Sequence, residues 1–474
     1  MSLHLVLLSG VRLWAPTRSL PERLPPDDDA LPEVLIQVPL FNEGNLIRRL
    51  VAALTALDWP RAKLHIQILD DSTGASLAIS QAVAQEFAAV GWHIELQHRT
   101  RRSGFKAGAL AAGLTTSDAA FVAIFDADFL PPPDFLRRTV GALLADPGLA
   151  YVQARWLHSN RNQNLLTRAQ ARLLDGHFLV EQEARQRLGL PTPFNGTCGL
   201  WRHAAIDEAG GWHGDTLTED LDLSLRARLA GWRSGYLADL GVPGLLPVSP
   251  RAWRMQQFRW TKGFIECLVK LAPSVWSSPR LATWQKLMIT LQLVQPLAFL
   301  AGCLTITASI PYIAGMAAPG PVVTALALGM AVGGMAGPIS LLLIGARTNS
   351  ASQQFRQWAG ASLWQGAAAL LLTSGLILSN ARANLEALIR HRSDFVRTPK
   401  PADAAGTAVR LRKRAGVFDL TAGGALLVFV LLQHPSAVLP LGLVIGGLLG
   451  FGLMQISEAR AQSPAAAGAI LDGD

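Results

Sequence analysis

The chain has 474 residues, of which 50% are hydrophobic and 16% are charged, and its mean hydropathy is +0.28. Soluble domains usually carry about 25% charged residues, so this composition excludes an ordinary soluble enzyme and indicates that part of the chain lies in lipid. The formal net charge of +8 suits a protein beside anionic lipid that binds an anionic substrate. Lys and Arg are not interleaved with aromatic residues in a recognisable binding module, which argues against nucleic acid as a partner.

The N-terminal segment, residues 1–30, begins with an apolar stretch from Met1 to Trp14. This stretch is shorter than the about 20 residues that span a bilayer, and it lacks a cleavage signature. Two interpretations stay open: either the segment lies on the membrane surface, or the start of the chain is missing.

Residues 31–245 alternate between apolar runs and helical patterns. The runs that predict parallel strands are 34–40, 65–69, 94–96 and 121–125. Segments 43–57 and 76–90 carry apolar residues at three- and four-residue spacing, which predicts helices between the strands. This alternation predicts an α/β fold with a doubly wound sheet, in which ligands bind at the carboxyl ends of the strands.

Two acidic pairs fall at the ends of predicted strands. Asp126 and Asp128 end the run 121–125, and Asp70 and Asp71 end the run 65–69. Carboxylates at such a strand end offer hard oxygen ligands to Mg²⁺ or Mn²⁺, which neutralises a substrate diphosphate. An isolated Asp-x-Asp is more often turn chemistry, and an isolated Asp often caps a helix. The prediction of a nucleotide-diphosphate site therefore rests on both pairs meeting at one sheet edge.

The segment between the two pairs, Arg99 to Leu110, combines cations with glycines before a predicted helix start. Its Arg102 and Lys106 are of the type that contacts phosphate oxygens. The first strand is followed neither by a Gly-x-x-x-x-Gly-Lys-Ser/Thr loop nor by a Gly-x-Gly-x-x-Gly turn, which disfavours NTPase and dinucleotide oxidoreductase chemistry. We therefore expect the nucleotide to be the donor of a transferred group.

Two further motifs lie downstream. Thr218-Glu219-Asp220 begins a predicted helix, where the helix dipole alone also favours acidic residues. Gln256-x-x-Arg259-Trp260 joins a cation that suits a leaving diphosphate to an indole that suits the face of a sugar. Each motif is a weak signal by itself.

The four motifs together, in this order, resemble those of the processive family 2 inverting glycosyltransferases, which are the cellulose synthases and their cellulose synthase-like relatives. The similarity is closest to the mannan, glucomannan and xyloglucan-backbone synthase-like branch. The segments that carry it are Gln37 to Glu43, Leu69 to Ser72, Gly104 to Leu110, Val152 to Trp156, Phe194 to Thr197 and Phe395 to Lys400.

This resemblance implies a GT-A nucleotide-sugar-binding domain with a role for each motif. Asp220, with Glu219 beside it, is implied to be the general base that takes the proton of the acceptor hydroxyl in one inverting displacement. The implied metal ligands for Mg²⁺ or Mn²⁺ are Asp126 and Asp128. The remaining implied contacts are Asp71, Asp70, Arg102 and Lys106 to the donor; Gln256, Arg259, Trp260 and Thr197 on the leaving-group and acceptor side; and Phe395, Thr398 and Lys400 in a gating loop that closes over the nucleotide.

The segments that suit lipid follow residue 286. They are 287–316, 321–345, 359–378, 417–432 and 437–454. Basic residues gather in 381–415, and the positive-inside rule places this loop in the cytoplasm. If the nucleotide-sugar domain lies on the same side as this loop, an even number of spans must separate the domain from the loop. Because three candidate segments lie between them, one cannot span, and we choose the shorter segment 359–378 as interfacial or re-entrant. About four true spans then remain. We therefore expect a glycosyltransferase domain in 31–245, interfacial helices in 246–285, transmembrane or re-entrant helices in 286–380, a cytoplasmic gating-like loop in 381–415, transmembrane helices in 416–456 and a flexible tail in 457–474.

The expected protein is a multi-pass inner-membrane hexosyltransferase with a cytoplasmic catalytic domain. It transfers sugar from GDP-mannose or UDP-glucose to a growing β-linked, β-1,4, polysaccharide and moves the product across the bilayer, so its expected partners are the nucleotide sugar, the glycan acceptor and the lipid. Two other functions stay open. One is transfer to a lipid acceptor such as ceramide or a polyprenyl phosphate; the other is an inactive transporter or scaffold, which the intact Asp126, Asp128 and Asp220 disfavour.

Several other polar residues are predicted to serve structure only. The histidines His177, His203 and His213 form no pair with metal-ligand spacing. The cysteines Cys198, Cys267 and Cys303 are too widely spaced for a disulfide framework or a zinc site. The amphipathic segment 165–188 is expected either to lie at the membrane interface or to cover the sheet.

Overall fold

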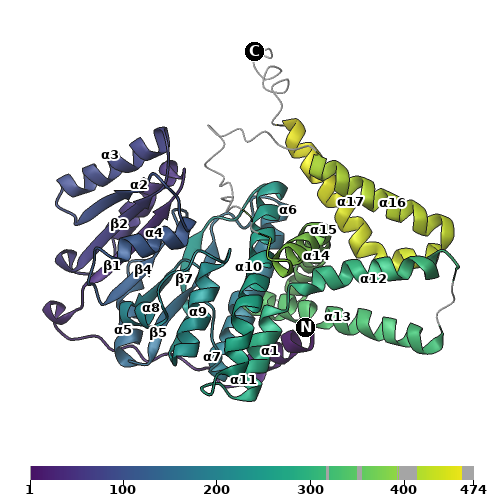
Figure 1. Ribbon diagram of the computed structural model, residues 1–474, viewed down its shortest axis with the longest axis horizontal. Coiled ribbons are helices and arrows are strands. Elements are labelled where there is room, and N and C mark those ends of the chain that lie inside the picture. Colours follow the sequence, from purple (N-terminus) through teal and green to yellow (C-terminus); the bar gives the residue numbers. More distant parts are fainter. Residues whose placement is uncertain (1, 317–319, 350–354, 392, 394–413, 462–474) are drawn as a thin grey trace, which may run out of the picture.

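The computed structural model describes residues 2–316, 320–349, 355–391, 393 and 414–461. A seven-stranded sheet with the strand order β3-β2-β1-β4-β6-β5-β7 forms one half of the molecule, and long helices form the other half (Figure 1). The strands are β1 (Val34–Leu40), β2 (Leu64–Asp70), β3 (Ile94–His98), β4 (Phe121–Ile124), β5 (Leu149–His158), β6 (Gly199–Arg202) and β7 (Arg233–Gly244).

The four strands predicted from the sequence run parallel to one another, as expected. All seven residues of β1 are buried, because a parallel strand in the middle of such a sheet is covered on both faces. The part of the sheet beyond β4 was not predicted: β6 runs antiparallel to both β4 and β5, while β5 and β7 are parallel. The α/β fold class with a GT-A type sheet is confirmed, and its second half is mixed.

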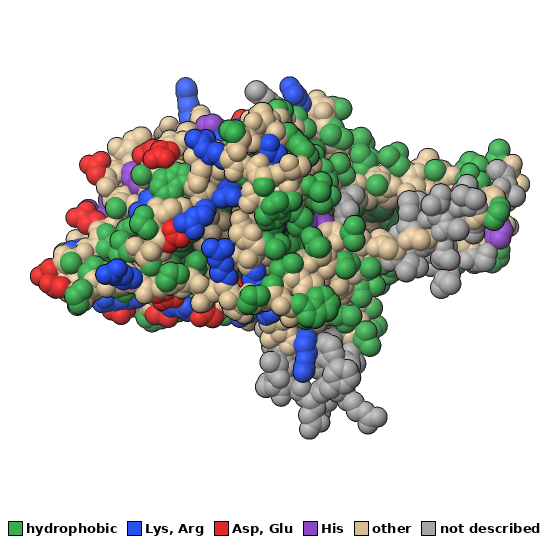
Figure 2. Space-filling model, turned by 90° about the horizontal axis from the view of Figure 1, so that it is seen from below, with side chains coloured by type: hydrophobic (Ala, Val, Ile, Leu, Met, Phe, Trp, Pro, Cys, Tyr) green, Lys and Arg blue, Asp and Glu red, His purple; other side chains and the backbone are tan. Residues whose placement is uncertain are grey.

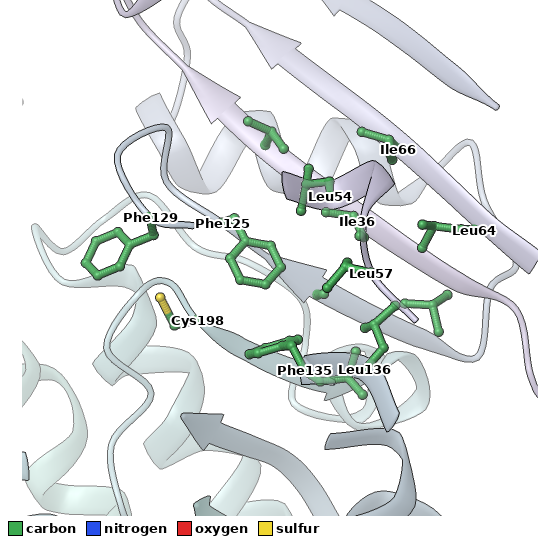
Figure 3. Packing of buried hydrophobic residues seen from close by; sticks show 14 of the residues in the cluster. Ile36, Leu54, Leu57, Leu64, Ile66, Phe125, Phe129, Phe135, Leu136 and Cys198 are labelled. Atoms are coloured by element: carbon green, nitrogen blue, oxygen red, sulfur yellow. The ribbon is translucent and has the colours of Figure 1, made fainter. Parts of the chain in front are cut away.

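Helices cover both faces of the sheet. They are α2 (Gly44–Thr55), α3 (Ala75–Ala89), α4 (Phe105–Leu114), α5 (Phe135–Ala145), α8 (His203–Glu208) and α9 (Glu219–Ala230). Neighbouring residues of a strand point to opposite faces, so Ile36 packs with Leu54, Phe125 and Phe135 on one face (Figure 3). Leu35 packs in the cluster on the other face. The two apolar layers hold the carboxyl ends of β1 and β4 in register.

The predicted helix over 165–188 is confirmed, with a π-helical turn in its middle. It consists of α6 (Leu165–Gly176), a π-helical turn (His177–Gln182) and α7 (Glu183–Leu188). The 28-residue helix α10 (Pro250–Ser277) lies between the sheet domain and the remaining helices (Figure 1). It begins where Ser249 caps the backbone N–H of Ala252 and Pro250 occupies the first turn.

The apolar helices follow α10. They are α11 (Thr283–Leu293), α12 (Leu297–Ile313), α13 (Pro321–Asn349), α14 (Phe355–Ser374), α15 (Ile377–Leu388), α16 (Arg414–Gln433) and α17 (Val438–Ala461). Hydrophobic side chains gather on the arm that α12, α13, α16 and α17 form, whereas charged side chains gather on the sheet domain (Figure 1 and Figure 2). Within the described ranges, two helices are long and apolar enough to cross a membrane, and there are up to four if each of two bent helix pairs is one span.

One bent pair lies where the sequence predicts an interfacial or re-entrant segment. Residues 363–374 and 377–388 meet at an angle of 51°, and α11 and α12 meet at 63°. These apolar helices are those of a membrane protein, while the number of spans and the domain boundaries stay predictions. The gating-loop candidates Phe395, Thr398 and Lys400 lie outside the described residues.

The N-terminal segment forms helix α1 (Ser2–Trp14), which packs against α13 and the region around α7. Leu8 is buried against Ala184 and Leu190, and the Ser9 and Ser340 hydroxyls lie 2.9 Å apart. The opposite face exposes Leu3, Leu7, Leu13 and Trp14. An apolar exposed face suits the expected position on the membrane surface, which stays a prediction.

Candidate active site

A pocket of about 160 Å³ opens at the carboxyl ends of β1 and β4 and is closed on its other side by α10. It collects residues from all four sequence motifs. Those among its lining are Asp71, Arg102, Lys106, Asp126, Asp128, Glu219, Asp220, Gln256, Arg259 and Trp260. Residues almost 190 positions apart in the chain therefore share one cavity.

Asp126 is fixed from two sides. Its side-chain Oδ1 accepts a hydrogen bond from Lys106 Nζ at 2.6 Å, and its backbone N–H donates to the Thr197 hydroxyl at 2.9 Å. Lys106 also donates to the Gly196 carbonyl at 2.9 Å. Burial alone would lower the pKa of Lys106, but the charges of Asp126 and Glu219 raise it above its usual value. Thr197 is fully buried, so it supports Asp126 from behind the pocket wall.

The pair Asp126 and Asp128 fits a hard divalent cation. Both side chains line the pocket, where they offer the carboxylate oxygens that such a cation prefers as ligands. A bound Mg²⁺ or Mn²⁺ would supply charge neutralisation for a diphosphate here.

The far end of the pocket is built by Asp71 and two arginines. Arg99 makes a bidentate ion pair with Asp71, with hydrogen bonds of 2.8 and 2.6 Å. The Arg102 guanidinium lies 3.4 Å above the centre of the Phe41 ring, and this flat surface suits stacking by a nucleobase. Asp70 is fully buried, and its Oδ1 accepts from the backbone N–H of Ser72 at 2.7 Å. It does not belong to the pocket lining and shapes the turn that presents Asp71.

Asp220 lies in the first turn of α9, where its Oδ1 accepts a hydrogen bond from the Leu221 N–H at 2.8 Å. Burial, and next the charge of Glu219, raise the pKa of Asp220 to about 7, against the opposing effect of Lys106 and Arg259. A carboxyl group with such a pKa can take up a proton near neutral pH. The backbone of Gly196 passes close by: a Cβ at this position would lie 2.9 Å from Asp220 Oδ2.

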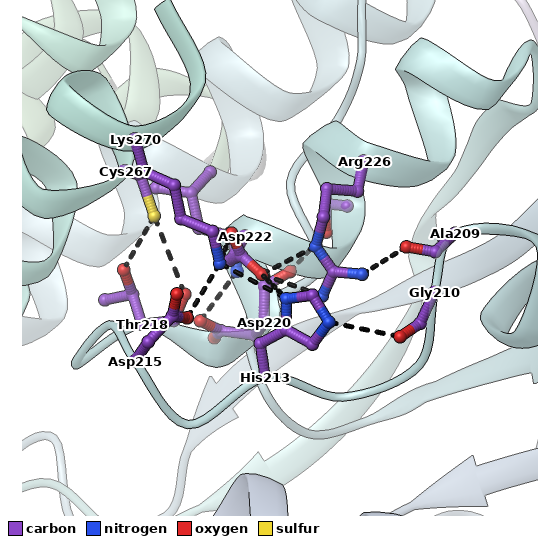
Figure 4. A network of polar contacts seen from close by, with 12 residues as sticks. Ala209, Gly210, His213, Asp215, Thr218, Asp220, Asp222, Arg226, Cys267 and Lys270 are labelled. Carbon is purple, nitrogen blue, oxygen red and sulfur yellow. Dashed lines mark hydrogen bonds and ion pairs between the residues drawn. The ribbon is translucent and has the colours of Figure 1, made fainter. Parts of the chain in front are cut away.

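Helix α9 is clamped against α10 directly behind Asp220 (Figure 4). The Leu217 N–H donates to Glu266 Oε2 at 2.8 Å, and Gly263 leaves room for Thr218. Lys270 reaches Asp222, which is fully buried, at 2.9 Å and Asp215 at 2.7 Å. The base candidate and the helix that carries Arg259 are therefore held as one unit.

His213, Asp215 and Asp222 could form a second metal group, because one ligand atom of each lies within 4.8 Å of the others. Asp222 is already paired with Arg226 at 2.7 Å and with Lys270 at 2.9 Å. These cations occupy the place of an ion. The cluster therefore serves to anchor α9.

Gln256, Arg259 and Trp260 share one face of α10, because positions three and four apart are neighbours on a helix. All three line the pocket. Burial lowers the pKa of Arg259, and the nearby charges of Glu219 and Asp126 oppose this effect, so its guanidinium faces the acidic groups across the cavity.

A second pocket of about 380 Å³ adjoins the first and extends between the sheet domain and the apolar helices. The two cavities share seven residues: Trp156, Leu174, Asn195, Thr218, Asp220, Gln256 and Trp260. Beyond these, the second pocket reaches Phe299 on α12 and Thr373 on α14. Asp220 thus lines both cavities.

Sequence reasoning missed part of this second wall. His177, Glu181 and Asn195 line it, although His177 had been assigned a structural role. Asn195 lies within the motif from Phe194 to Thr197, and Trp156 lies within the motif from Val152 to Trp156, so these two carried a signal. His177 and Glu181 carried none apart from their place in an amphipathic helix.

The amino-acid sequence is similar to those of known proteins. Residues 32–263 match the model of the glycosyltransferase like family 2. Glucomannan 4-beta-mannosyltransferase 2 of Arabidopsis thaliana is 43% identical over 272 residues, which cover 56% of this chain and 51% of that protein. Glucomannan 4-beta-mannosyltransferase 1 of Oryza sativa subsp. japonica is 40% identical over 297 residues, covering 60% of this chain and 56% of that protein. The chain thus spans about half the length of the curated relatives it matches.

A solved structure shares the fold. The mannosyltransferase PcManGT from Pyrobaculum calidifontis, in complex with GDP-Man and Mn²⁺, has a TM-score of 0.52 at 19% sequence identity and covers 81% of this chain and 98% of its own. Together with the four motifs gathered in one pocket, the family match and the relatives at 40 to 43% identity show that residues 32–263 form a family 2 glycosyltransferase domain of the cellulose synthase-like, mannan synthase-like branch.

Proposed function

We propose that the protein transfers mannosyl groups from GDP-mannose to the end of a β-1,4-linked polysaccharide, with inversion at the anomeric carbon. The observation that carries this proposal is the position of Asp220, which lines both the pocket of donor-type residues and the adjoining second pocket. A base between two cavities can take a proton from a hydroxyl in one while that oxygen attacks a sugar held in the other.

The donor side holds charge of both signs in the required places. Asp126 and Asp128 are proposed to hold Mg²⁺ or Mn²⁺, and Lys106 and Arg259 are proposed to neutralise the diphosphate as it leaves. Asp71 and Arg102 lie at the end of the pocket that fits the nucleoside. We propose GDP-mannose rather than UDP-glucose as the donor because the two plant relatives are named glucomannan mannosyltransferases.

The acceptor side is proposed to be the second pocket. Trp156 and Trp260 offer aromatic faces, on which the apolar face of a sugar ring can stack. Asp220 takes the proton of the attacking hydroxyl, and because attack and departure of the nucleotide occur on opposite sides of the anomeric carbon, an α-linked donor gives a β-linked product.

The second pocket continues toward the apolar helices, which supports coupling of transfer to movement of the product across a membrane. The expected setting is the inner membrane, with the catalytic domain on the cytoplasmic side. The same observation favours a second candidate: Phe264, Pro296 and Phe299 give part of this pocket an apolar lining, which also suits the hydrocarbon part of a lipid acceptor.

Product analysis separates these functions. Membrane-embedded protein is given radiolabelled GDP-mannose or UDP-glucose, each with Mn²⁺ or Mg²⁺, and the product is digested with linkage-specific glycanases. A large product from GDP-mannose that β-mannanase degrades supports the proposal. Label that extracts into organic solvent supports the lipid acceptor instead, and turnover of neither donor contradicts both.

A further inference from the structure

The π-helical turn His177–Gln182 forms one wall of the second pocket. A π turn inserts an extra residue into a helix, and such turns occur frequently at functional sites. Here it brings His177, Phe178 and Glu181 to the cavity. The His177 and Glu181 side chains keep 24% and 13% of their surface exposed, so a small molecule in the cavity can reach them.

A chain of hydrogen bonds fixes the state of the His177 ring. Gln182 Nε2 donates to the Pro193 carbonyl at 2.9 Å, and a carbonyl can only accept, so the orientation of this amide is set. Gln182 Nε2 also lies 2.9 Å from Asn195 Oδ1, which turns the Asn195 amide nitrogen toward His177 Nε2 at 3.2 Å. His177 Nε2 therefore accepts. The ring proton lies on Nδ1, which donates to Glu181 Oε2 at 3.1 Å.

Glu181 is the ionised end of this chain. Burial alone would raise the pKa of Glu181, but the hydrogen bond from His177 and the charge of Arg185 hold it below its usual value. Arg185 is itself almost fully buried at 1% exposure. An ionised carboxylate in a partly closed cavity is a strong hydrogen-bond acceptor for a hydroxyl group.

Asn195 connects this wall to the reaction centre. It lines both pockets, and its backbone N–H donates to Gln153 Oε1 at 2.9 Å. The next residue, Gly196, accepts from Lys106 and passes beside Asp220. A group held by Asn195 is therefore placed relative to both the base and the donor.

We propose that Glu181, His177 and Asn195 are positioning residues that bind the hydroxyl groups of the acceptor's terminal sugar and aim one of them at Asp220. The inference rests on the proposed function and adds the residues that select a polyol acceptor. Apolar side chains such as Leu173, Phe264 and Phe299 make up much of the surrounding wall, so a sugar in this pocket depends on the few polar groups placed there.

The experiment compares Glu181→Gln and His177→Ala with a matched control, His203→Ala. His203 forms a similar pair four residues apart, with Asp207 at 3.9 Å, and belongs to neither pocket lining. Three quantities are measured on the full-length protein: kcat and KM for a soluble β-1,4-mannooligosaccharide at saturating GDP-mannose, hydrolysis of GDP-mannose without acceptor, and the Kd of GDP.

Loss of a hydrogen bond to a charged group is expected to raise the acceptor KM of Glu181→Gln about tenfold or more, while hydrolysis and the Kd of GDP stay within about twofold of the parent protein. His177→Ala should likewise raise the acceptor KM without changing hydrolysis or the Kd of GDP, and His203→Ala should change none of the three quantities. An unchanged acceptor KM in both pocket variants overturns the inference. Glu181→Gln keeps the volume of the side chain. If this variant also loses hydrolysis and GDP binding, Glu181 has a structural role and the inference is overturned. If the parent protein turns over no GDP-mannose, the proposed function itself fails and the inference falls with it.

Discussion

The two pockets that meet at Asp220 differ in how they are built. The donor pocket carries charges of both signs, as in the contact between Lys106 and Asp126 at 2.6 Å, and its residues come from short motifs at strand ends and helix starts. The second pocket is larger and more apolar, and helices far apart in the chain form it, so that Leu173 on α6 and Phe299 on α12 line one cavity. Under the proposed function, the donor chemistry is set locally by the sheet, whereas acceptor selection depends on how the apolar helices dock.

The largest effect is expected for Asp220→Asn, which removes the base shared by the two pockets. Transfer should fall by about 10³-fold or more because the acceptor hydroxyl loses its proton acceptor. Nucleotide affinity should stay near that of the parent protein, as measured by titration calorimetry with GDP. A large loss of GDP affinity would show instead that Asp220 belongs to the donor pocket alone.

The thermal stability of Asp220→Asn shows whether the variant is still folded. The pKa of Asp220 rises from 3.8 to about 7, so at intermediate pH the folded protein holds a proton that the unfolded chain has released, and stability falls as pH rises through this range. Asn removes this cost. Asp220→Asn should therefore unfold at the same or a higher temperature than the parent at pH 8, and a lower Tm would mean that lost activity reflects damage to the fold.

A smaller effect, confined to the donor pocket, is expected for Asp128→Ala. Removing one proposed metal ligand should weaken Mn²⁺-dependent binding of GDP about tenfold or more, while binding without metal changes little. Asp118→Ala is the matched control, because Asp118 is exposed and precedes β4 at the opposite edge of the sheet. Identical titration curves for Asp128→Ala and the parent in Mn²⁺ would place the metal elsewhere.

Gly196→Ala tests whether transfer requires the close approach of the Gly196 backbone to Asp220, and Gly211→Ala is its control. Gly196 has φ of +80° and Gly211 has φ of +76°, but only at Gly196 does an added Cβ crowd Asp220, since nothing lies within 4 Å of one at Gly211. Both variants should lose about 1 kcal/mol or more of stability to the strained backbone. Only Gly196→Ala should also lose transfer activity at a temperature where both are folded, and equal activity in the two variants would refute the crowding argument.

The smallest effect is a change with pH. Because burial and Glu219 raise the pKa of Asp220 to about 7, kcat/KM should rise with pH and reach its half-maximum near this value, as more of the base becomes ionised. Initial rates between pH 5.5 and about 8.5 measure this limb. A rate that is constant over this range would contradict Asp220 as the titrating base.

The donor pocket could be predicted from the sequence because its residues follow strand ends, where apolar runs such as 121–125 show where the chain turns. Asp126, Asp128 and Asp220 do lie together, and the parallel strands fall close to their expected bounds. Strand β6 escaped prediction because Gly199–Arg202 holds only two apolar residues, between a glycine and an arginine, whereas β4 is equally short but wholly apolar. The hydrogen bonds from His177 to Glu181 and Asn195 escaped because they depend on a π turn and on the packing of separate segments, which no spacing within one segment indicates.

The central claim is that Asp220 catalyses a single displacement between a donor in one pocket and an acceptor in the other. The most direct test is the anomeric configuration of the first bond formed, read by proton NMR on the product of GDP-mannose and a short mannooligosaccharide before any further extension. A β-linked product, formed from the α-linked donor, is the predicted result. An α-linked product would contradict the account, because retention requires a second nucleophile and cannot arise from one displacement with Asp220 as base.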